Sequence, residues 1–243
     1  MIYKKSINLY NDGNGRVDYV THMGNDLTVV NSARVSFGVE KESLDEKDKK
    51  LISYLIRHRH TSTLEHNLIT FRFCVPMFVR SQHHRHRTWS YNEISRRYTD
   101  VNIRFYEPQS FRTQHRSNRQ ASNSEDLINP KIMQKHPEMT HETLVSASKL
   151  IAQHHKESLS LFDNLIEAGV CREQARGVLP QNLYTEYYGT VNLSNLLKFI
   201  DLRTHEGAQW EIQKVAEACL EIATDLFPET VGAYSRVKEK NNE

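Results

Sequence analysis

Residues 67–98 read NLITFRFCVPMFVRSQHHRHRTWSYNEISRRY, and this stretch predicts a strand, a helix and a charged loop in direct succession. Apolar and polar residues alternate from Asn67 to Val75, which is typical of a β-strand with one buried face. Pro76 ends that strand and can open a helix from Met77 to about His84, because proline suits the start of a helix. We therefore expect two regular elements to hold the loop that follows in place.

That loop, residues 85–98, contains four Arg, and from residue 51 to residue 130 the chain has twelve Arg and no Lys. Arginine is preferred where a planar fork grips a phosphate or carboxylate through two hydrogen bonds, or stacks on a ring. Ser90 and Ser95 add hydroxyls that can reach the same anion, and Glu93 can accept from a ligand N–H. This composition favours a pocket for a phosphorylated, ring-containing small molecule.

A solvated charged surface and an RNA-binding surface are the alternatives for this basic region. For a non-enzymatic RNA-binding protein, residues 58–119 would form the surface, and Trp89, Tyr91, Tyr98 and Phe105 would stack on bases. The net charge is only +2, and no known RNA-binding motif is present. We therefore expect no nucleic acid partner.

Three histidines and an acid between residues 58 and 66 raise the question of a metal site. His58, His60, Glu65 and His66 match no zinc-ligand spacing, and no Cys lies near them. The sequence favours a polar loop that faces a ligand, and we expect no metal.

Composition predicts a globular protein of a reducing compartment. The chain has 243 residues, of which 38% are hydrophobic and 26% charged. Its three Cys form neither a CxxC pair nor an even framework, which favours the cytoplasm. We expect no signal peptide, and no apolar run approaches the ~20 residues that a membrane span needs. No membrane partner is expected.

Other segments extend this picture to the whole chain. A turn is expected at residues 11–15, and Asp26 to Phe37 reads as a short strand and a turn into a helix. Residues 107–140 are polar and are expected to be a variable insertion or surface loop. A helix is expected at 46–59, preceded by Ser43 and Asp45 and led by acidic residues. A second is expected at 140–168, capped by Thr140, closed by Gly169 and part of the core scaffold. Further helices are expected at 171–178, 195–203 and 206–227, and a strand at 184–191. We predict one α+β domain over residues 1–243, with several helices packed around a small mixed or antiparallel sheet.

Three blocks of sequence resemble one enzyme family. The six positions Arg85, His86, Arg87, Ser90, Ser95 and Arg97 fit the pattern R-H-R-x-x-S-x-x-x-x-S-x-R. Residues 172–180, REQARGVLP, and Leu202-Arg203 followed by AQWEI at 208–212 are the other two blocks. All three are similar to the motifs of the flavin-dependent thymidylate synthases, and the resemblance covers about residues 26–234.

The resemblance implies reductive methylation of dUMP to dTMP. In that reaction 5,10-methylenetetrahydrofolate supplies the carbon, NADPH supplies reducing equivalents, and FAD carries hydride between them. It also implies a homotetramer in which Glu93 to Arg97 and Arg176 come from one chain, while Arg85 and Arg203 at the same dUMP come from another.

The resemblance assigns roles to individual residues. Arg203 becomes the catalytic arginine, which lies against the uracil. The implied dUMP contacts are Gln82, His83, His84, Arg85, Glu93, Ile94, Ser95, Arg96, Arg97, Arg176 and Arg203. The implied FAD contacts are Ser62, Arg85, His86, Arg87, Glu93, Asn192, Leu193, Ser194 and Lys198. Two positions depart from the family pattern. This chain has Gly207 where the family often has His, and Lys198 where some members have Asn for a flavin contact.

Ser95 leaves two roles open. A serine nucleophile needs an adjacent base, and no His–Ser pair is evident in the sequence. We expect Ser95 to be a ligand contact and not a covalent nucleophile. No Cys lies in any of the three motifs, so a thiol nucleophile is not supported.

Overall fold

The computed structural model describes residues 4–134 and 143–242, and its largest sheet is antiparallel. The five strands follow the order β1-β2-β3-β9-β4. Their bounds are β1 Ser6–Asn8, β2 Arg16–Met23, β3 Leu68–Pro76, β4 Ser90–Glu93 and β9 Tyr184–Asn192. The strands predicted at 67–75 and 184–191 are confirmed, as is the α+β fold class with an antiparallel sheet.

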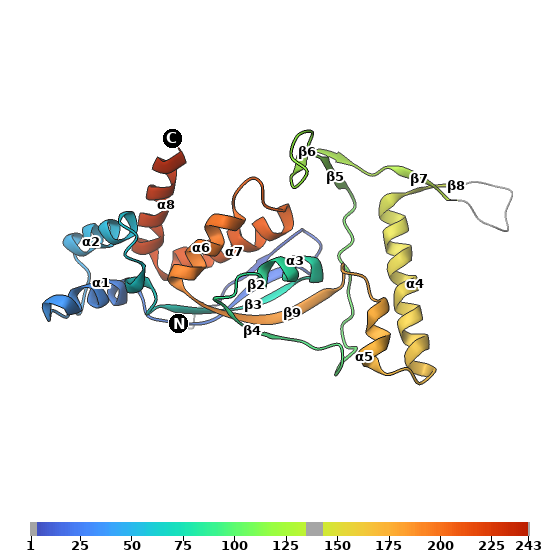
Figure 1. The fold of residues 1–243 in the computed structure, drawn as a ribbon, viewed down its shortest axis with the longest axis horizontal. Coiled ribbons are helices and arrows are strands. Elements are labelled where there is room, and N and C mark those ends of the chain that lie inside the picture. Colours follow the sequence, from blue (N-terminus) through green and yellow to red (C-terminus); the bar gives the residue numbers. More distant parts are fainter. Residues whose placement is uncertain (1–3, 135–142, 243) are drawn as a thin grey trace.

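The pairing of β3 with β9 positions two helices of the predicted site. The register runs without interruption from Leu68 opposite Asn192 to Pro76 opposite Tyr184. Helix α3 (Met77–His83) therefore starts at one end of the pair, and α6 (Leu193–Arg203) starts at the other. Because the two strands are antiparallel, α6 returns over the sheet and its last residue reaches α3 (Figure 1).

Strand β4 lies inside the loop that we expected at residues 85–98. Its residues Ser90–Glu93 pair with Tyr187–Thr190 of β9 at the edge of the sheet. They show no apolar alternation, so local sequence does not predict a strand there. Pairing with β9 extends them instead.

Helices α6 and α7 (Trp210–Leu226) cover one face of the sheet (Figure 1). Ile69, Phe71 and Phe73 of β3 are fully buried in the same hydrophobic cluster as residues of these helices. Arg72 and Tyr188 lie on the other face, which is polar and exposed. Alternation along β3 and β9 thus separates the core from the open face.

The segment after Gly24 is a helix, so the predicted short strand is wrong. Helix α1 spans Asp26–Arg34, and the 3-10 turn η1 (Val35–Phe37) follows. Asn25 caps α1: its side chain accepts from the Thr28 N–H, and the Thr28 hydroxyl accepts from the Asn25 N–H. This capping box and the burial of Val29 and Val30 outweigh the preference of β-branched residues for strands.

Two other helices bear on the predictions for the remaining chain. The predicted helix at 46–59 is confirmed as α2 (Glu46–Arg57); of the two residues expected to precede it, Asp45 is the cap, and η2 (Thr61–Leu64) follows. Helix α7 begins four residues later than predicted, because the backbone of its N-cap Gln209 is extended.

Helix α8 (Pro228–Asn242) is a further element, which the sequence did not predict. Buried Asp26 accepts from the backbone N–H groups of Glu229 and Thr230, which are among the free donors at the start of α8. The helix start is therefore fixed by a residue about two hundred positions away in the chain.

Helix α4 (Ala147–Glu167) and α5 (Arg172–Ala175) stand apart from the sheet (Figure 1). Helix α4 packs on α5 and the turn η3 (Arg176–Val178), so it is not part of the core scaffold around the sheet. Gly169, with φ 89°, closes it as predicted.

The segment before α4 also differs from expectation. Strands β5 (Phe111–Gln114) and β6 (Ser122–Ile128) pair with each other, and β7 (Lys131–Gln134) pairs with β8 (Thr143–Ser146). The described part of residues 107–140 is thus largely extended hairpin. Helix α4 starts at Ala147, and the predicted cap Thr140 lies outside the described residues. Over residues 4–134 and 143–242, no helix is long and apolar enough to cross a membrane.

Candidate functional site

Two distant parts of the chain, residues 82–86 and 203–209, meet at the C-terminal end of α6. Arg203 donates from Nε to His86 Nε2 at 3.0 Å, and from a terminal nitrogen to the Gln82 carbonyl at 3.2 Å. The Gln82 side chain in turn bonds the side chain of Gln209, just before α7. The third sequence block, through Arg203 and Gln209, thus joins one cluster with the first block, while the second block, residues 172–180, does not take part.

The electrostatics of this cluster keep the His86 imidazole neutral. Its Nε2 accepts from Arg203, so that nitrogen carries no proton. Burial, and then the nearby Arg203 charge, lower the pKa of His86 from 6.5 to about 4. Burial and then the charge of Arg85 also lower the pKa of Arg203 below its ordinary value. Arg85 and Arg87 are exposed beside this cluster.

His83 and His84 differ in what they offer a ligand. The His83 ring is fully buried, shares a hydrogen bond of 2.8 Å with the Tyr187 hydroxyl, and packs against Phe73 and Trp89. Burial lowers its pKa well below the ordinary value. The side chain of His83 is therefore a core residue, and ligand contact through that side chain is not supported. His84 is half-buried and stacks on Tyr91, with ring centroids 4.0 Å apart.

Glu93 is held by one of its oxygens. Arg80 donates from Nε to Oε1 at 3.0 Å, and the Thr185 hydroxyl donates to the same oxygen at 2.7 Å. Both bonds fall on Oε1, so Glu93 has a fixed carboxylate with its second oxygen available to accept from a ligand. Arg80 and Thr185 are site residues that the motif match did not indicate.

The loop after β4 brings Arg97 to the segment that carries Arg176. Arg97 pairs with Glu173 of α5 at 3.4 Å and is half exposed. Ser95 Oγ accepts from the Arg97 backbone N–H at 3.3 Å, and neither a histidine nor a carboxylate bonds Ser95 among the described residues. Ile94 is exposed. The Arg96 guanidinium donates to the Val101 carbonyl, five residues further along the same loop, at 2.8 Å.

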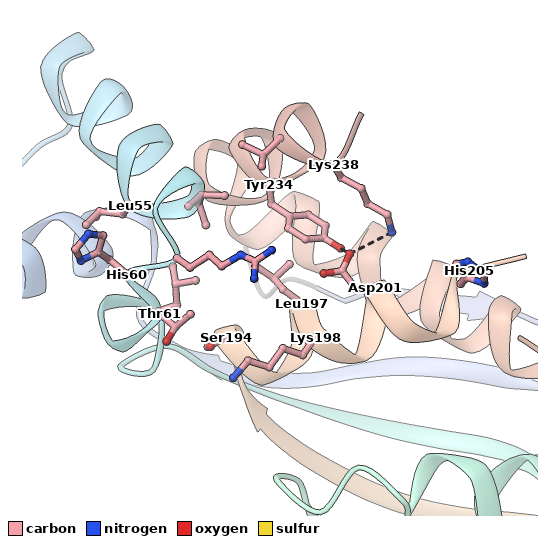
Figure 2. Close-up of a pocket in the computed structure, with 14 residues that line it drawn as sticks. Leu55, His60, Thr61, Ser194, Leu197, Lys198, Asp201, His205, Tyr234 and Lys238 are labelled. Atoms are coloured by element: carbon pink, nitrogen blue, oxygen red, sulfur yellow. Dashed lines mark hydrogen bonds and ion pairs between the residues drawn. The ribbon is translucent and has the colours of Figure 1, made fainter. Parts of the chain in front are cut away.

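A cavity of about 540 Å³ lies between α2, α6 and α8 (Figure 2). Its apolar wall contains Leu55, Ile56, Leu64, Leu197 and Val237, and its cations are Arg59, Lys198 and Lys238. Lys238 pairs with Asp201 at 3.3 Å, and the Tyr234 hydroxyl donates to the same carboxylate. The sequence did not predict Arg59, Tyr234 or Lys238 as site residues. Tyr234 and Lys238 lie on α8, a helix that the sequence did not predict.

Some of the predicted flavin contacts line this cavity and others do not. Ser194 and Lys198 line it, and the Ser194 hydroxyl is buried with no hydrogen-bond partner among the described residues. Asn192 caps α6 by accepting from the Asn195 N–H at 2.9 Å, and Leu193 is buried in the core. Ser62 is exposed on η2.

One chain does not gather all the predicted residues around one pocket. Ser194 and Arg203 lie at opposite ends of α6, and nine residues at 1.5 Å each place them about 14 Å apart. Arg97 and Arg176 lie at a third place, beside α5. Among the described residues, no group of three or more His, Cys, Asp or Glu side chains could hold a metal ion.

Comparisons with known proteins agree on one family. A family model described as thymidylate synthase complementing protein matches residues 18–229. A flavin-dependent thymidylate synthase of Thermotoga neapolitana is 39% identical over 94% of this chain and 94% of its own length. One from Thermus thermophilus is 41% identical over 90% of this chain and 75% of its own length.

Solved structures agree with this result. The UMP/dUMP methylase PolB of Streptomyces cacaoi, bound with 5-Br dUMP, superimposes with a TM-score of 0.74 at 31% identity. The match covers 90% of this chain and 94% of that one.

Proposed function

This chain belongs to the flavin-dependent thymidylate synthases, and from that premise we propose that it makes dTMP from dUMP with 5,10-methylenetetrahydrofolate, NADPH and FAD. As a member of this family it is a methyl-transferring enzyme that depends on a flavin. We propose that the flavin is FAD, that the carbon donor is 5,10-methylenetetrahydrofolate and that the reductant is NADPH. Membership of this family argues against the RNA-binding alternative, because the basic motif of residues 85–97 is part of the family resemblance.

The observation that carries the proposal is the convergence of Arg203, His86 and Gln82. A fixed guanidinium is what the chemistry of the uracil ring requires, because attack at C6 places negative charge on the ring. Arg203 is held by two acceptors and is partly withdrawn from water, so it stabilises that charge without first reorganising. Because His86 is neutral, the positive charge of the cluster of Arg203, His86 and Gln82 is carried by arginine alone.

Arg97 and Arg176 would bind the phosphate of dUMP. Both guanidiniums are exposed, and Glu173 occupies one of them in this chain. Two forked donors match a phosphate that carries about two negative charges. Gln82, Arg85, Glu93, Ser95 and the backbone of residues 83, 84, 94 and 96 complete the proposed nucleotide contacts. In this arrangement Ser95 contributes a hydroxyl to binding and no covalent bond.

The cavity of Figure 2 fits a flavin nucleotide. Its apolar wall suits a ring system, its three cations suit phosphate groups, and the unpaired Ser194 hydroxyl has a hydrogen bond to offer. Ser62, Asn192, Leu193 and Lys198 are proposed to hold the flavin from this side, with Arg85, His86, Arg87 and Glu93 from another. A bound flavin supplies hydride transfer, while the protein binds and orients.

We propose a homotetramer with sites shared between chains. The predicted residues lie in three separate groups within one chain, which supports completion of each site by a neighbour. Apolar side chains are exposed on the outlying elements, where a second chain would cover them: Ile132, Met133, Leu144 and Leu161. We further propose that residues 1–243 act as one domain in the cytoplasm, without nucleic acid or membrane partners.

An anaerobic titration tests the flavin proposal directly. Purified protein mixed with FAD should show the spectrum of a bound flavin, and NADPH should bleach it. Adding dUMP and 5,10-methylenetetrahydrofolate should then restore the oxidised spectrum and produce dTMP. Protein that takes up no FAD, or that forms no dTMP when loaded with it, would contradict the proposal.

A further inference from the structure

Three arginines on the open face of the sheet converge on one carboxylate, that of Glu186. Arg16 pairs with Cys74 across β2 and β3, and Cys74 pairs with Glu186 across β3 and β9. These three residues form a row on one face, and Arg72 lies on the same face two positions before Cys74. Arg72 bonds Glu186 Oε2, which Arg16 also approaches at 3.5 Å, and Arg104 reaches Oε1 at 3.4 Å.

A fourth arginine, Arg96, joins this group from the loop after β4. Arg72, Arg96, Arg104 and Glu186 line a hollow of about 130 Å³. The Nε atoms of Arg96 and Arg104 are buried and have no hydrogen-bond partner in the part of the chain that the structure describes. A buried charged donor without an acceptor is costly, so these two groups indicate that an acceptor from outside the chain belongs here.

The charge of the cluster points to an anion. Four guanidiniums face Glu186 and Asp18, which accepts from Arg16 Nε at 3.1 Å. The next acid, Asp100, is engaged by Arg172 at 2.7 Å. Cys74 beside the cluster stays a neutral thiol, because burial raises its pKa to about 11. Two positive charges therefore remain, and arginine cannot lose its charge to relieve them.

We propose that this hollow is a binding site for a small tetrahedral oxyanion, with inorganic phosphate as its ligand. A hollow of about 130 Å³ is well below the roughly 300 Å³ at which pockets for larger organic ligands begin, so a whole nucleotide does not fit. The site goes beyond the proposed function and does not depend on it. A bound phosphate would pair with Arg96 and so fix the loop that carries Ser95 and Arg97.

Phosphate titration of the purified protein, first alone and then with added FAD and increasing dUMP, tests the site separately from the proposed nucleotide sites. Binding is measured by calorimetry at constant ionic strength set with chloride. Arg96→Gln and Arg104→Gln should each weaken phosphate binding by about tenfold or more, the scale of one charged hydrogen bond. The matched control is Arg119→Gln, which removes an exposed arginine outside the cluster and should change nothing.

Glu186→Gln separates an anion site from a purely structural ion-pair network. At an anion site the loss of this carboxylate removes a competitor, so phosphate should bind more tightly than to the unmodified protein. A network that only holds the strands together would bind no phosphate in either form. That result, or phosphate affinity that falls as dUMP is added, would overturn the proposal. Should Arg104→Gln not fold, Arg96→Gln decides, since its one described hydrogen bond stays within its own loop.

Discussion

At the residue scale, Arg97 is a proposed phosphate contact whose one ion-pair partner in the described structure is weakly held. Its guanidinium pairs with Glu173 at 3.4 Å, which is a long, half-exposed contact and therefore weak. A phosphate carrying about two negative charges would compete well for it. The geometry of the fork, and not charge alone, is what the proposed function requires of this residue.

Arg97→Lys should lower dUMP affinity by about 1.5–3 kcal/mol, the scale of a charged hydrogen bond, because lysine keeps the charge and loses the fork. Equilibrium binding of dUMP to the flavin-loaded protein measures the change. Flavin affinity should stay the same in that variant, and Arg119→Lys serves as the exposed control. Equal dUMP affinity in both variants would remove Arg97 from the phosphate site.

His86 makes stability depend on pH. Its pKa is lowered from 6.5 to about 4 in the folded chain, so the unfolded chain binds the proton first as the pH falls. The contribution of His86 is therefore fully present above pH 6.5 and is lost as the pH falls toward about 4. Buried His83, whose pKa is lowered in the same direction, adds to this loss.

We expect the free energy of unfolding to decrease from pH 6.5 to pH 4, and His86→Gln should make that decrease shallower. Urea denaturation at several pH values measures it. His154→Gln, at an exposed position on α4, is the control and should keep the slope of the unmodified protein. If His86→Gln keeps that slope too, His86 does not resist protonation in the fold.

Helix α8 shows at the element scale how one buried side chain can place a whole helix. Asp26 accepts from the N–H groups of Glu229 and Thr230 at 3.0 and 2.9 Å, and the Thr230 hydroxyl also donates to it. Helix α8 then supplies Tyr234 and Lys238 to the cavity of Figure 2. The proposed flavin site thus depends on a contact between α1 and α8.

Asp26→Ala should destabilise the protein by about 2–4 kcal/mol, because it leaves the buried N–H and hydroxyl of Thr230 and the part-buried N–H of Glu229 without their charged acceptor. Flavin affinity should also fall, measured under conditions in which the variant remains folded. Asp163→Ala, which removes an exposed aspartate of α4, is the matched control. Normal flavin binding by folded Asp26→Ala would show that α8 does not shape that site.

At the scale of the whole molecule, the outlying position of α4 and α5 bears on the proposal that sites are shared between chains. Arg176 and Glu173 lie in this outlying layer, whereas Arg203 and His86 lie over the sheet (Figure 1). A symmetric assembly in which each chain offers both surfaces would unite the two groups at sites between chains.

Mixing two inactive variants tests that arrangement. Arg97→Ala and Arg203→Ala should each abolish most dTMP formation. When the two are co-expressed and mixed oligomers are isolated, random pairing should leave roughly a quarter of two-chain sites intact. Activity should therefore reappear at about that fraction of the unmodified level. Mixed oligomers as inactive as their parents would place both arginines in the same site of one chain.

The sequence by itself determined the elements whose causes are local. Alternation from Asn67 to Val75 marks β3, Asp45 caps α2, and Gly169 ends α4, because each effect depends on neighbours within one or two turns of chain. The three motifs also identified the family. Their order and spacing are a property of the chain, which needs no knowledge of where the side chains lie.

Only the tertiary structure decided which residues meet. Burial of Val29 and Val30 favoured a helix over a strand in α1, pairing with β9 made β4 a strand, and Asp26 placed α8. Arg203 meets His86 across 117 residues, and Arg80 meets Glu93 around the turn that follows α3. Such contacts depend on strand order and helix direction, which the pattern of neighbouring residues does not encode, so the clusters around Arg203 and Glu186 emerge only in the folded chain.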